Sequence, residues 1–343
     1  MGWFDNFRRE RRESSPGVET SGVENRGAAT AEVVDENSFQ TKTEDIEDYG
    51  EGLGQAEVLK DESLDESHSS SSSTSVKSYK DKKPVTAQIG DTKVIAIINQ
   101  KGGVGKSTTA VNLSAALGEM GKQVLLVDLD PQGNATSGLG VEKSQINQCI
   151  YDVLLNDVDI KDVIIPDVCE GLDLVPATIN LAGAEVELVA EMARENRLKD
   201  ALKDMRGKYD YIFIDCPPSL GLLTVNALVG SDNLIIPIQT EFYALEGVTK
   251  LLESMKRVKN RLNPSLEIFG ILLTMYDGRT TLSRQVASEV RNYFGDSVFE
   301  TIIPRTVKLS EAPSYGIPIS QYDPVGKGAV SYNNLAKEVM QRG

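Results

Sequence analysis

The sequence predicts an α/β protein with a doubly wound, mostly parallel sheet and helices on both faces. Short apolar runs alternate with longer helix-like stretches from Lys93 onward. Several runs, such as residues 124–127, are apolar at consecutive positions, which indicates strands that are buried on both faces. A glycine-rich turn at residues 101–105 joins the first strand-like run to the first helix-like run, an arrangement typical of phosphate-binding turns.

Strands are expected where short runs rich in Val, Ile, Leu and Phe end near a polar residue or a proline. Along the chain these are residues 93–99, 123–128, 172–176, 209–215, 233–237, 268–275 and 298–303. Helices are expected where longer stretches carry apolar residues every three or four positions. These are residues 107–118, 181–205, 222–228, 244–262, 282–293 and 329–340. Helical connections between strands favour parallel pairing.

The chain divides by composition into a tail, residues 1–90, and a domain, residues 91–343. The tail is rich in Ser, Glu, Asp, Gly and Thr, so we expect it to be disordered. Within it, residues 31–66 hold thirteen acidic and two basic side chains, a net charge of −11 out of −15 for the chain. The domain is therefore only mildly acidic, and its charge is compatible with a local basic surface.

Several classes of protein are disfavoured by composition. No apolar run approaches the roughly 20 residues that span a bilayer. The N-terminus lacks the apolar core and the cleavage site of a secretory signal, so we expect a cytoplasmic location. The three cysteines, Cys149, Cys169 and Cys216, are too few and too scattered for a disulfide framework or a zinc site.

The glycine-rich turn is the strongest candidate for a site. Its backbone N–H groups, together with the N-terminus of the following helix, can bind the phosphates of a nucleotide. Lys106 would neutralise the β- and γ-phosphates, and the Ser107 hydroxyl would bind Mg²⁺. The common pattern has glycine where this chain has Gln100, and a second lysine follows. The candidate nucleotide-binding residues of the turn are Gly102, Gly103, Val104, Gly105, Lys106, Ser107 and Thr108.

Carboxylates follow two further strands. Asp128 and Asp130 follow the run 124–127, and Asp215 follows the run 211–214. In an open parallel sheet, ligands bind beyond the carboxyl ends of the strands, so these side chains are expected beside the glycine-rich turn. Phosphoryl transfer needs a metal ion, charge neutralisation and an oriented water. We expect Asp128 and Asp215 near the metal, partly through water, and Asp130 as the residue that orients water.

These motifs together resemble the ParA/Soj partition ATPases. The matching runs are NQKGGVGKST (residues 99–108), DLDPQGNAT (128–136), DCPPSLG (215–221), EFYALEG (241–247) and PRTVKLSEAP (304–313). The turn is similar to the deviant Walker A loop, a variant of the P-loop NTPase motif, and Asp215 is similar to the Walker B aspartate. The resemblance covers roughly residues 92–341 and leaves the tail outside.

The resemblance implies an ATP-dependent switch that uses ATP and Mg²⁺. ATP-bound members form a face-to-face homodimer in which the lysine at the position of Lys101 reaches the partner's nucleotide. The dimer binds DNA without sequence preference on the bacterial nucleoid. A ParB-like centromere-binding protein stimulates slow hydrolysis, which releases the dimer and so positions a chromosome or a plasmid. Lys101, Lys106 and Asp130 are the expected catalytic residues.

Further residues are assigned by position and resemblance. Thr274, Met275 and Pro304 resemble the loops that pack against adenine. Arg279 and Lys308 are the best candidates for DNA binding, with Arg305 beside Lys308 in the loop after the run 298–303. DNA binding without sequence preference needs such cations directed at phosphates. The basic side chains of residues 244–262 are either a further part of that surface or a solvated helix face.

A MinD-type ATPase and an iron–sulfur carrier are the alternative interpretations. A MinD-type membrane-associated ATPase would need a C-terminal amphipathic helix, but residues 334–343 are short and mixed in charge. An iron–sulfur carrier would need paired cysteines. Residues 1–12 contain Trp3, Phe4 and Phe7 followed by four arginines, which suggests a weak docking or membrane contact or an unstructured terminus. The acidic residues 31–66 could compete with DNA for the basic surface.

Overall fold

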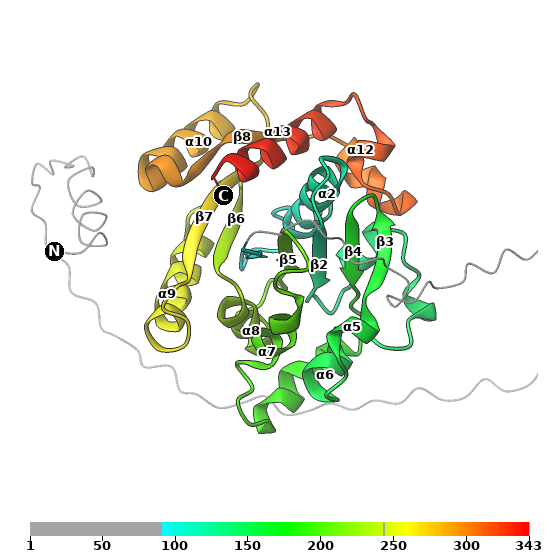
Figure 1. Cartoon of the computed structure of the whole chain (residues 1–343). Helices are drawn as coiled ribbons and strands as arrows, with labels where there is room; N and C mark the ends of the chain where they lie inside the picture. Colours follow the sequence, from blue (N-terminus) through cyan, green and yellow to red (C-terminus); the bar gives the residue numbers. More distant parts are fainter. Residues whose placement is uncertain (1–90, 243, 343) are drawn as a thin grey trace, which may run out of the picture. The chain divides into compact units, whose positions relative to one another are not determined.

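The computed structural model of the chain describes residues 91–242 and 244–342. The predicted tail, with its acidic stretch and the aromatic and basic residues 1–12, lies outside the described residues. These described residues contain one eight-stranded sheet in the order β3-β4-β2-β5-β1-β6-β7-β8, with helices on both faces (Figure 1). All pairs are parallel except β3 with β4. The predicted doubly wound, mostly parallel fold is confirmed.

All strands except β3 agree with the predicted runs to within a few residues. Their bounds are β1 (Lys93–Ile97), β2 (Val124–Asp128), β3 (Ile165–Cys169), β4 (Leu172–Val175), β5 (Tyr211–Asp215), β6 (Asn233–Gln239), β7 (Glu267–Tyr276) and β8 (Val298–Pro304).

Two groups of helices cover the sheet. The face that carries the first helix is covered by α2 (Lys106–Glu119), α3 (Asn134–Gly138), α11 (Lys308–Glu311), α12 (Ile319–Tyr322) and α13 (Lys327–Arg342). The opposite face is covered by α4 (Ile150–Leu155), α5 (Ile160–Val163), α6 (Leu181–Glu187), α7 (Arg197–Leu202), α8 (Leu222–Gly230), α9 (Glu246–Arg261) and α10 (Thr281–Phe294). Short 3₁₀ turns η2 to η6 lie at Lys143–Gln145, Leu188–Ala190, Lys203–Met205, Gly295–Ser297 and Ala312–Tyr315.

Strand β1 lies inside the sheet because its side chains are apolar on both sides. Ile95 and Ile97 join the apolar cluster under α2 and α13, whereas Val94 and Ala96 join the cluster under α8 and α9. A strand that is apolar at every position is stable only between two layers of helix. This placement puts the turn after β1 between the carboxyl ends of β5 and β6.

One helix prediction was wrong. Residues 181–205 do not form one helix; α6 and η3 end before Glu191, and α7 begins at Arg197. Ala193 at the break has a φ of 51°. The buried amide of Asn226 on α8 donates to the Arg194 carbonyl inside the break (2.8 Å) and accepts from the Leu198 N–H on α7 (3.1 Å). A tertiary partner thus replaces the helical bonds, which local periodicity cannot reveal.

Strand β3 and the short helices α3, α4, α5, α11 and α12 were not predicted. Strand β3 is antiparallel and partly exposed, and it contains Pro166 and Asp167, whose φ is 54°. Proline and a left-handed residue are unfavourable in a strand, so the run lacks the usual signal. The short helices have too few turns to produce a periodic pattern.

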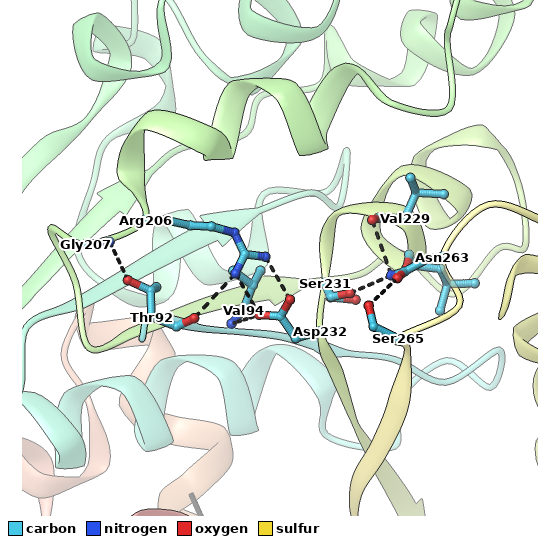
Figure 2. Close-up of polar contacts among 10 residues, drawn as sticks. Thr92, Val94, Arg206, Gly207, Val229, Ser231, Asp232, Asn263 and Ser265 are labelled. Carbon is cyan, nitrogen blue, oxygen red and sulfur yellow. Dashed lines mark hydrogen bonds and ion pairs between the residues drawn. The ribbon is translucent and has the colours of Figure 1, made fainter. Parts of the chain in front are cut away.

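Polar contacts join the strands at the amino edge of the sheet (Figure 2). Arg206 forms two bonds with the Asp232 carboxylate (2.8 and 3.0 Å), which also accepts the Val94 N–H (3.0 Å). The buried Asn263 amide donates to the carbonyls of Leu228 (2.9 Å) and Ser231 (2.7 Å). It makes a longer hydrogen bond to the Val229 carbonyl (3.3 Å). The Asn263 bonds hold the loop before β7 to the end of α8 and to the loop before β6, and the Asp232 bonds hold that second loop to β1 and to Arg206.

We predict that Asn263→Ala lowers the free energy of unfolding by about 2–3 kcal/mol, because it leaves buried carbonyl groups without a donor. Urea denaturation followed by circular dichroism measures the change. The matched control is Asn260→Ala on the exposed side of α9, for which we expect no loss. Equal effects of the two substitutions would contradict this role of the Asn263 amide.

Candidate nucleotide site at the carboxyl edge of the sheet

The turn between β1 and α2 has the backbone geometry of a phosphate-binding loop. Gly105 is the N-cap of α2 with a φ of 89°, and Gly103 has a φ of 72°. A side chain is strained in this left-handed region, so glycine is required at both positions. The Thr274 hydroxyl at the end of β7 donates to the Val104 carbonyl (2.8 Å) and so ties the loop to β7.

Two lysines belong to this loop. Lys106 is buried, and its Nζ lies 3.5 Å from the Lys101 carbonyl oxygen, to which it donates. The Lys101 N–H donates to Asn99 Oδ1 (3.0 Å), and Asn99 in turn donates to the Pro237 carbonyl at the end of β6 (2.7 Å). The loop therefore holds the ammonium group of Lys106 against its own backbone, beside N–H groups at the start of α2 that can bind an anion.

Asp128 and Asp215 are direct neighbours in the pairing of β2 with β5. Asp128 is fully buried and accepts three hydrogen bonds, from the Thr136 hydroxyl (2.7 Å), the Thr136 N–H (2.8 Å) and the Asp130 N–H (3.1 Å). Burial nevertheless raises its pKa to about 6, because these bonds offset only part of the desolvation. Thr136 thus holds the Asp128 carboxylate with two hydrogen bonds. Sequence reasoning did not identify this contact, although Thr136 lies within the motif of residues 128–136.

Asp215 is also fully buried, but neither of its carboxylate oxygens accepts a hydrogen bond from any described residue. Burial raises its pKa well above the usual value, and the charge of Asp128 raises it further. The nearby Ser107 hydroxyl and Lys106 ammonium lower the pKa in part. A buried carboxylate without a donor is costly unless a cation or a proton satisfies it.

These residues fit a magnesium ion. Asp215 offers unpartnered oxygens, Ser107 offers a hydroxyl, and Asp128 lies next to Asp215. Among the described residues there is no group of three His, Cys, Asp or Glu side chains that could enclose a metal. A site with few protein ligands suits Mg²⁺, which keeps water and takes phosphate oxygens rather than a closed protein cage.

Asp130 lies at the same edge, in the segment that follows β2. It is buried, and its Oδ1 accepts the Gln132 N–H (2.9 Å). The structure thus brings the loop lysines and all three predicted carboxylates to one edge of the sheet. Their assigned roles stay predictions.

The predicted adenine residues lie at the ends of β7 and β8. Thr274 contacts the loop through Val104, and Met275 beside it has an unfavourable φ of 51°. Pro304 pairs in register with Tyr276. Pro304 also lines a pocket of about 360 Å³ with Tyr276, Ile302, Val325, Lys327, Val330 and Ser331. This pocket lies at β8 and the start of α13, and the glycine loop does not line it.

The three predicted DNA-binding cations are exposed at the ends of β7 and β8 and on α11, and each is paired. Arg279 forms two bonds with Asp277 (2.7 and 2.9 Å) and is 91% exposed. Arg305 lies 3.6 Å from Glu241, and its N–H donates to the carbonyl of Tyr276, the residue before Asp277 (3.0 Å). Lys308 pairs with Glu311 at 3.0 Å. Such exposed pairs contribute little to stability.

Comparison with known proteins identifies the family. A model described as "AAA domain" matches residues 92–268. The chain is 59% identical to the sporulation initiation inhibitor protein Soj of Bacillus subtilis, over 73% of this chain and 99% of that protein. It is 54% identical to the chromosome partitioning protein ParA of Myxococcus xanthus, over 73% of this chain and 88% of that protein. The chain belongs to the Soj/ParA family of chromosome partitioning proteins. The predicted resemblance is confirmed.

Solved structures agree with this family assignment. The septum site-determining protein MinD of Pyrococcus horikoshii, complexed with Mg-ADP, is 30% identical with a TM-score of 0.60, over 72% of this chain and 96% of that chain. A Mycobacterium smegmatis structure titled cobyrinic acid a,c-diamide synthase, with bound ATP analogue and magnesium, is 40% identical with a TM-score of 0.65. That match covers 73% of this chain and 95% of the other.

The two buried carboxyls predict an unusual dependence of stability on pH. A carboxyl whose pKa is higher in the folded than in the unfolded chain binds more protons when folded. The stability that such a carboxyl contributes to the folded state is therefore complete below its pKa in the unfolded chain, about 4. This stability is lost as pH rises through the pKa in the folded chain, which is about 6 for Asp128. We expect the nucleotide-free protein to lose stability between these pH values.

Asp215→Asn tests the origin of this loss. The amide removes the buried charge, so we expect the nucleotide-free variant to be more stable than the wild type at pH 8, by about 1–3 kcal/mol. At pH 4 the difference should shrink. Urea midpoints measured without magnesium at both pH values check this, with the exposed Asp200→Asn as control. A variant no more stable than the wild type at pH 8 would contradict the assignment of the cost to Asp215.

Proposed function

We propose that this chain is an ATP-dependent partition ATPase whose cofactors are ATP and Mg²⁺. The observation that carries the proposal is the unpartnered, buried Asp215 carboxylate beside Ser107 and Lys106 at a glycine-rich helix N-terminus. A site with these groups suits a cation at Asp215 and an anion at the glycine-rich turn. The Mg-ADP in the MinD structure and the ATP analogue with magnesium in the mycobacterial structure support this choice.

The loop residues bind the nucleotide phosphates in this proposal. The backbone N–H groups of residues 102–108 would donate to phosphate oxygens, and Lys106 would neutralise the β- and γ-phosphates. Ser107 and Asp215, with Asp128 nearby, would hold magnesium, which withdraws negative charge from the phosphates when bound. The ends of β7 and β8, with Thr274, Met275 and Pro304, would contact the base.

Asp130 would orient the attacking water, and Lys101 would act between two copies of the chain. The Gln132 N–H bond holds the Asp130 carboxylate at the edge where the phosphate loop lies. Gly102 and Gly103 are exposed, and no other residue lies within 4 Å of where their side chains would point. The loop surface is therefore open to a second copy, which supports a face-to-face dimer around both nucleotides.

The dimer would bind DNA without sequence preference through Arg279, Arg305 and Lys308. A ParB-like centromere-binding protein would stimulate hydrolysis, which releases the dimer from the nucleoid. Arg279 is held at the loop after β7 by Asp277, and this contact lowers the pKa of Asp277 to about 2. The ionic pairs of these three cations would exchange for phosphate contacts on binding.

The C-terminal helix argues against the membrane-associated alternative. In α13, Leu335, Ala336 and Val339 are buried against α2 and the sheet, and Arg342 donates to the Val298 carbonyl (2.9 Å). Such a helix is not available to insert into a lipid surface. None of the described helices is both long enough and apolar enough to span a bilayer.

Two substitutions separate nucleotide binding from hydrolysis. We expect Lys106→Ala to abolish ATP binding, because the charge on the phosphates is no longer neutralised. We expect Asp130→Ala to keep ATP-dependent DNA binding but to lower turnover at least about 100-fold, the usual size of a lost acid–base or orienting group. Phosphate release and gel-shift assays measure the two properties. Normal hydrolysis by the Asp130 variant would refute its role.

A third substitution tests the DNA surface. Each phosphate contact contributes about −0.9 to the slope of log K against log salt concentration. We expect Arg279→Ala to weaken DNA binding and reduce that slope by about one, whatever the sequence of the DNA. Arg291→Ala on the exposed side of α10 is the control. Co-sedimentation with DNA measures DNA binding, and a separate co-sedimentation with liposomes measures membrane binding. Capture by liposomes but not by DNA would favour the MinD-type alternative.

A further inference from the structure

Asp130 stands at the start of a tight turn that leads into α3. Gly133, at the end of the turn, is the N-cap of α3, and its N–H donates to the Asp130 carbonyl (2.8 Å). The Asp130 carboxylate accepts the N–H of Gln132 in the middle of the turn (2.9 Å). The direction of this carboxylate therefore depends on how Gln132 is held.

Gln132 is held from outside the turn by Lys143, a half-buried residue of η2. The Lys143 ammonium donates to the Gln132 carbonyl (2.8 Å). A hydrogen bond from an ionised donor is stronger than one between neutral groups. Gln132 thus takes part in two bonds at once, because its N–H reaches Asp130 and its carbonyl reaches Lys143.

The stem of Lys143 also packs against the turn. A Cβ atom at Gly133 would lie 2.9 Å from Lys143 Cδ and 2.8 Å from the Ala177 carbonyl oxygen, both closer than a real Cβ contact. Gly133 is therefore enclosed by Lys143 and by the segment after β4. The turn cannot move toward Lys143 unless that side chain moves, and the packed stem keeps the ammonium beside the carbonyl that it binds.

Lys143 reaches the turn because the chain reverses its direction after α3. Gly140, with a φ of 76°, follows the helix, and η2 begins three residues later at Lys143. The N-cap residue of η2, Glu142, accepts the Ser144 hydroxyl (3.0 Å) and so supports this short helical turn. Lys143 lies outside the motif of residues 128–136, so its contact with the turn depends on this reversal and has no local sequence signal.

Helix α3 has supports of its own that do not involve Lys143. Thr136 donates twice to the Asp128 carboxylate and accepts the Ala177 N–H (3.0 Å). These buried bonds fasten α3 to the ends of β2 and β4. Loss of the Lys143 bond should therefore loosen the turn at Asp130 without unfolding α3.

We propose that Lys143 is a positioning residue for hydrolysis. Through the Gln132 carbonyl it fixes the turn that begins at Asp130, and so it fixes the direction of the Asp130 carboxylate. The inference rests on the proposed function, in which Asp130 orients the attacking water. ATP binding does not depend on Lys143, because the phosphate loop belongs to the segment between β1 and α2.

The first experiment compares turnover with ATP affinity in the full-length chain. Lys143→Met keeps a long stem but has no donor for the Gln132 carbonyl. We expect it to lower kcat about tenfold, as for a misplaced catalytic group, while the KM for ATP changes less than about twofold. Lys143→Arg keeps a charged donor, so most of the turnover should return. ATP-dependent DNA binding should be unchanged in both variants.

Lys122→Met is the matched control, because Lys122 lies before β2, at the opposite edge of the sheet, and pairs with Asp210 (3.8 Å). This control should leave kcat unchanged. Equal turnover of the wild type and Lys143→Met would overturn the proposal. A loss of ATP affinity, of DNA binding or of thermal stability that accounts for the slower turnover would indicate a purely structural role and would overturn it as well.

A second experiment combines Lys143→Met with Asp130→Ala. If Lys143 acts through Asp130, the double variant should hydrolyse ATP at the rate of Asp130→Ala alone, because the two effects are not additive. Phosphate release under single-turnover conditions measures these slow rates. A loss by the same factor in both backgrounds would overturn the role of Lys143. A wild type that does not hydrolyse ATP, or an Asp130→Ala variant with normal turnover, would instead refute the proposed function.

Discussion

The burial of two neighbouring carboxylates at the ends of β2 and β5 is the constraint on which the rest of the site depends. Asp128 and Asp215 lie side by side in the sheet, where water does not stabilise their charge. Two buried like charges on neighbouring strands are unfavourable unless protons, hydrogen-bond donors or cations compensate them. The chain compensates Asp128 with Thr136 and leaves Asp215 facing Lys106 and Ser107.

The position of the phosphate loop follows from the same arrangement. Because β1 lies between β5 and β6, its carboxyl end places the glycine turn beside Asp215. Asn99 and Thr274 then tie the loop to β6 and β7 by bonds to the Pro237 and Val104 carbonyls. The loop is thus held from both sides, so the charges are arranged before any ligand binds. Preorganisation of this kind lowers the cost of binding a highly charged phosphate.

Side-chain hydrogen bonds connect the segment after Asp215 to helices α6 and α8. Glu185 joins α6 to the first residue of α8, and Asn226 on α8 joins that helix to the break after η3. The helices near residues 216–221 are therefore connected by side-chain bonds rather than by a continuous apolar interface alone.

The sequence by itself determined the fold class, the strands of the inner sheet and the residues of the phosphate loop. Those features depend on local signals: consecutive apolar residues, and glycines at positions where φ must be positive. Only the tertiary structure decided that residues 181–205 break, that β3 joins the edge, and that Thr136 satisfies Asp128 while Asp215 stays unpartnered. These outcomes depend on which distant groups share a buried space, and local propensity carries no information about such long-range contacts.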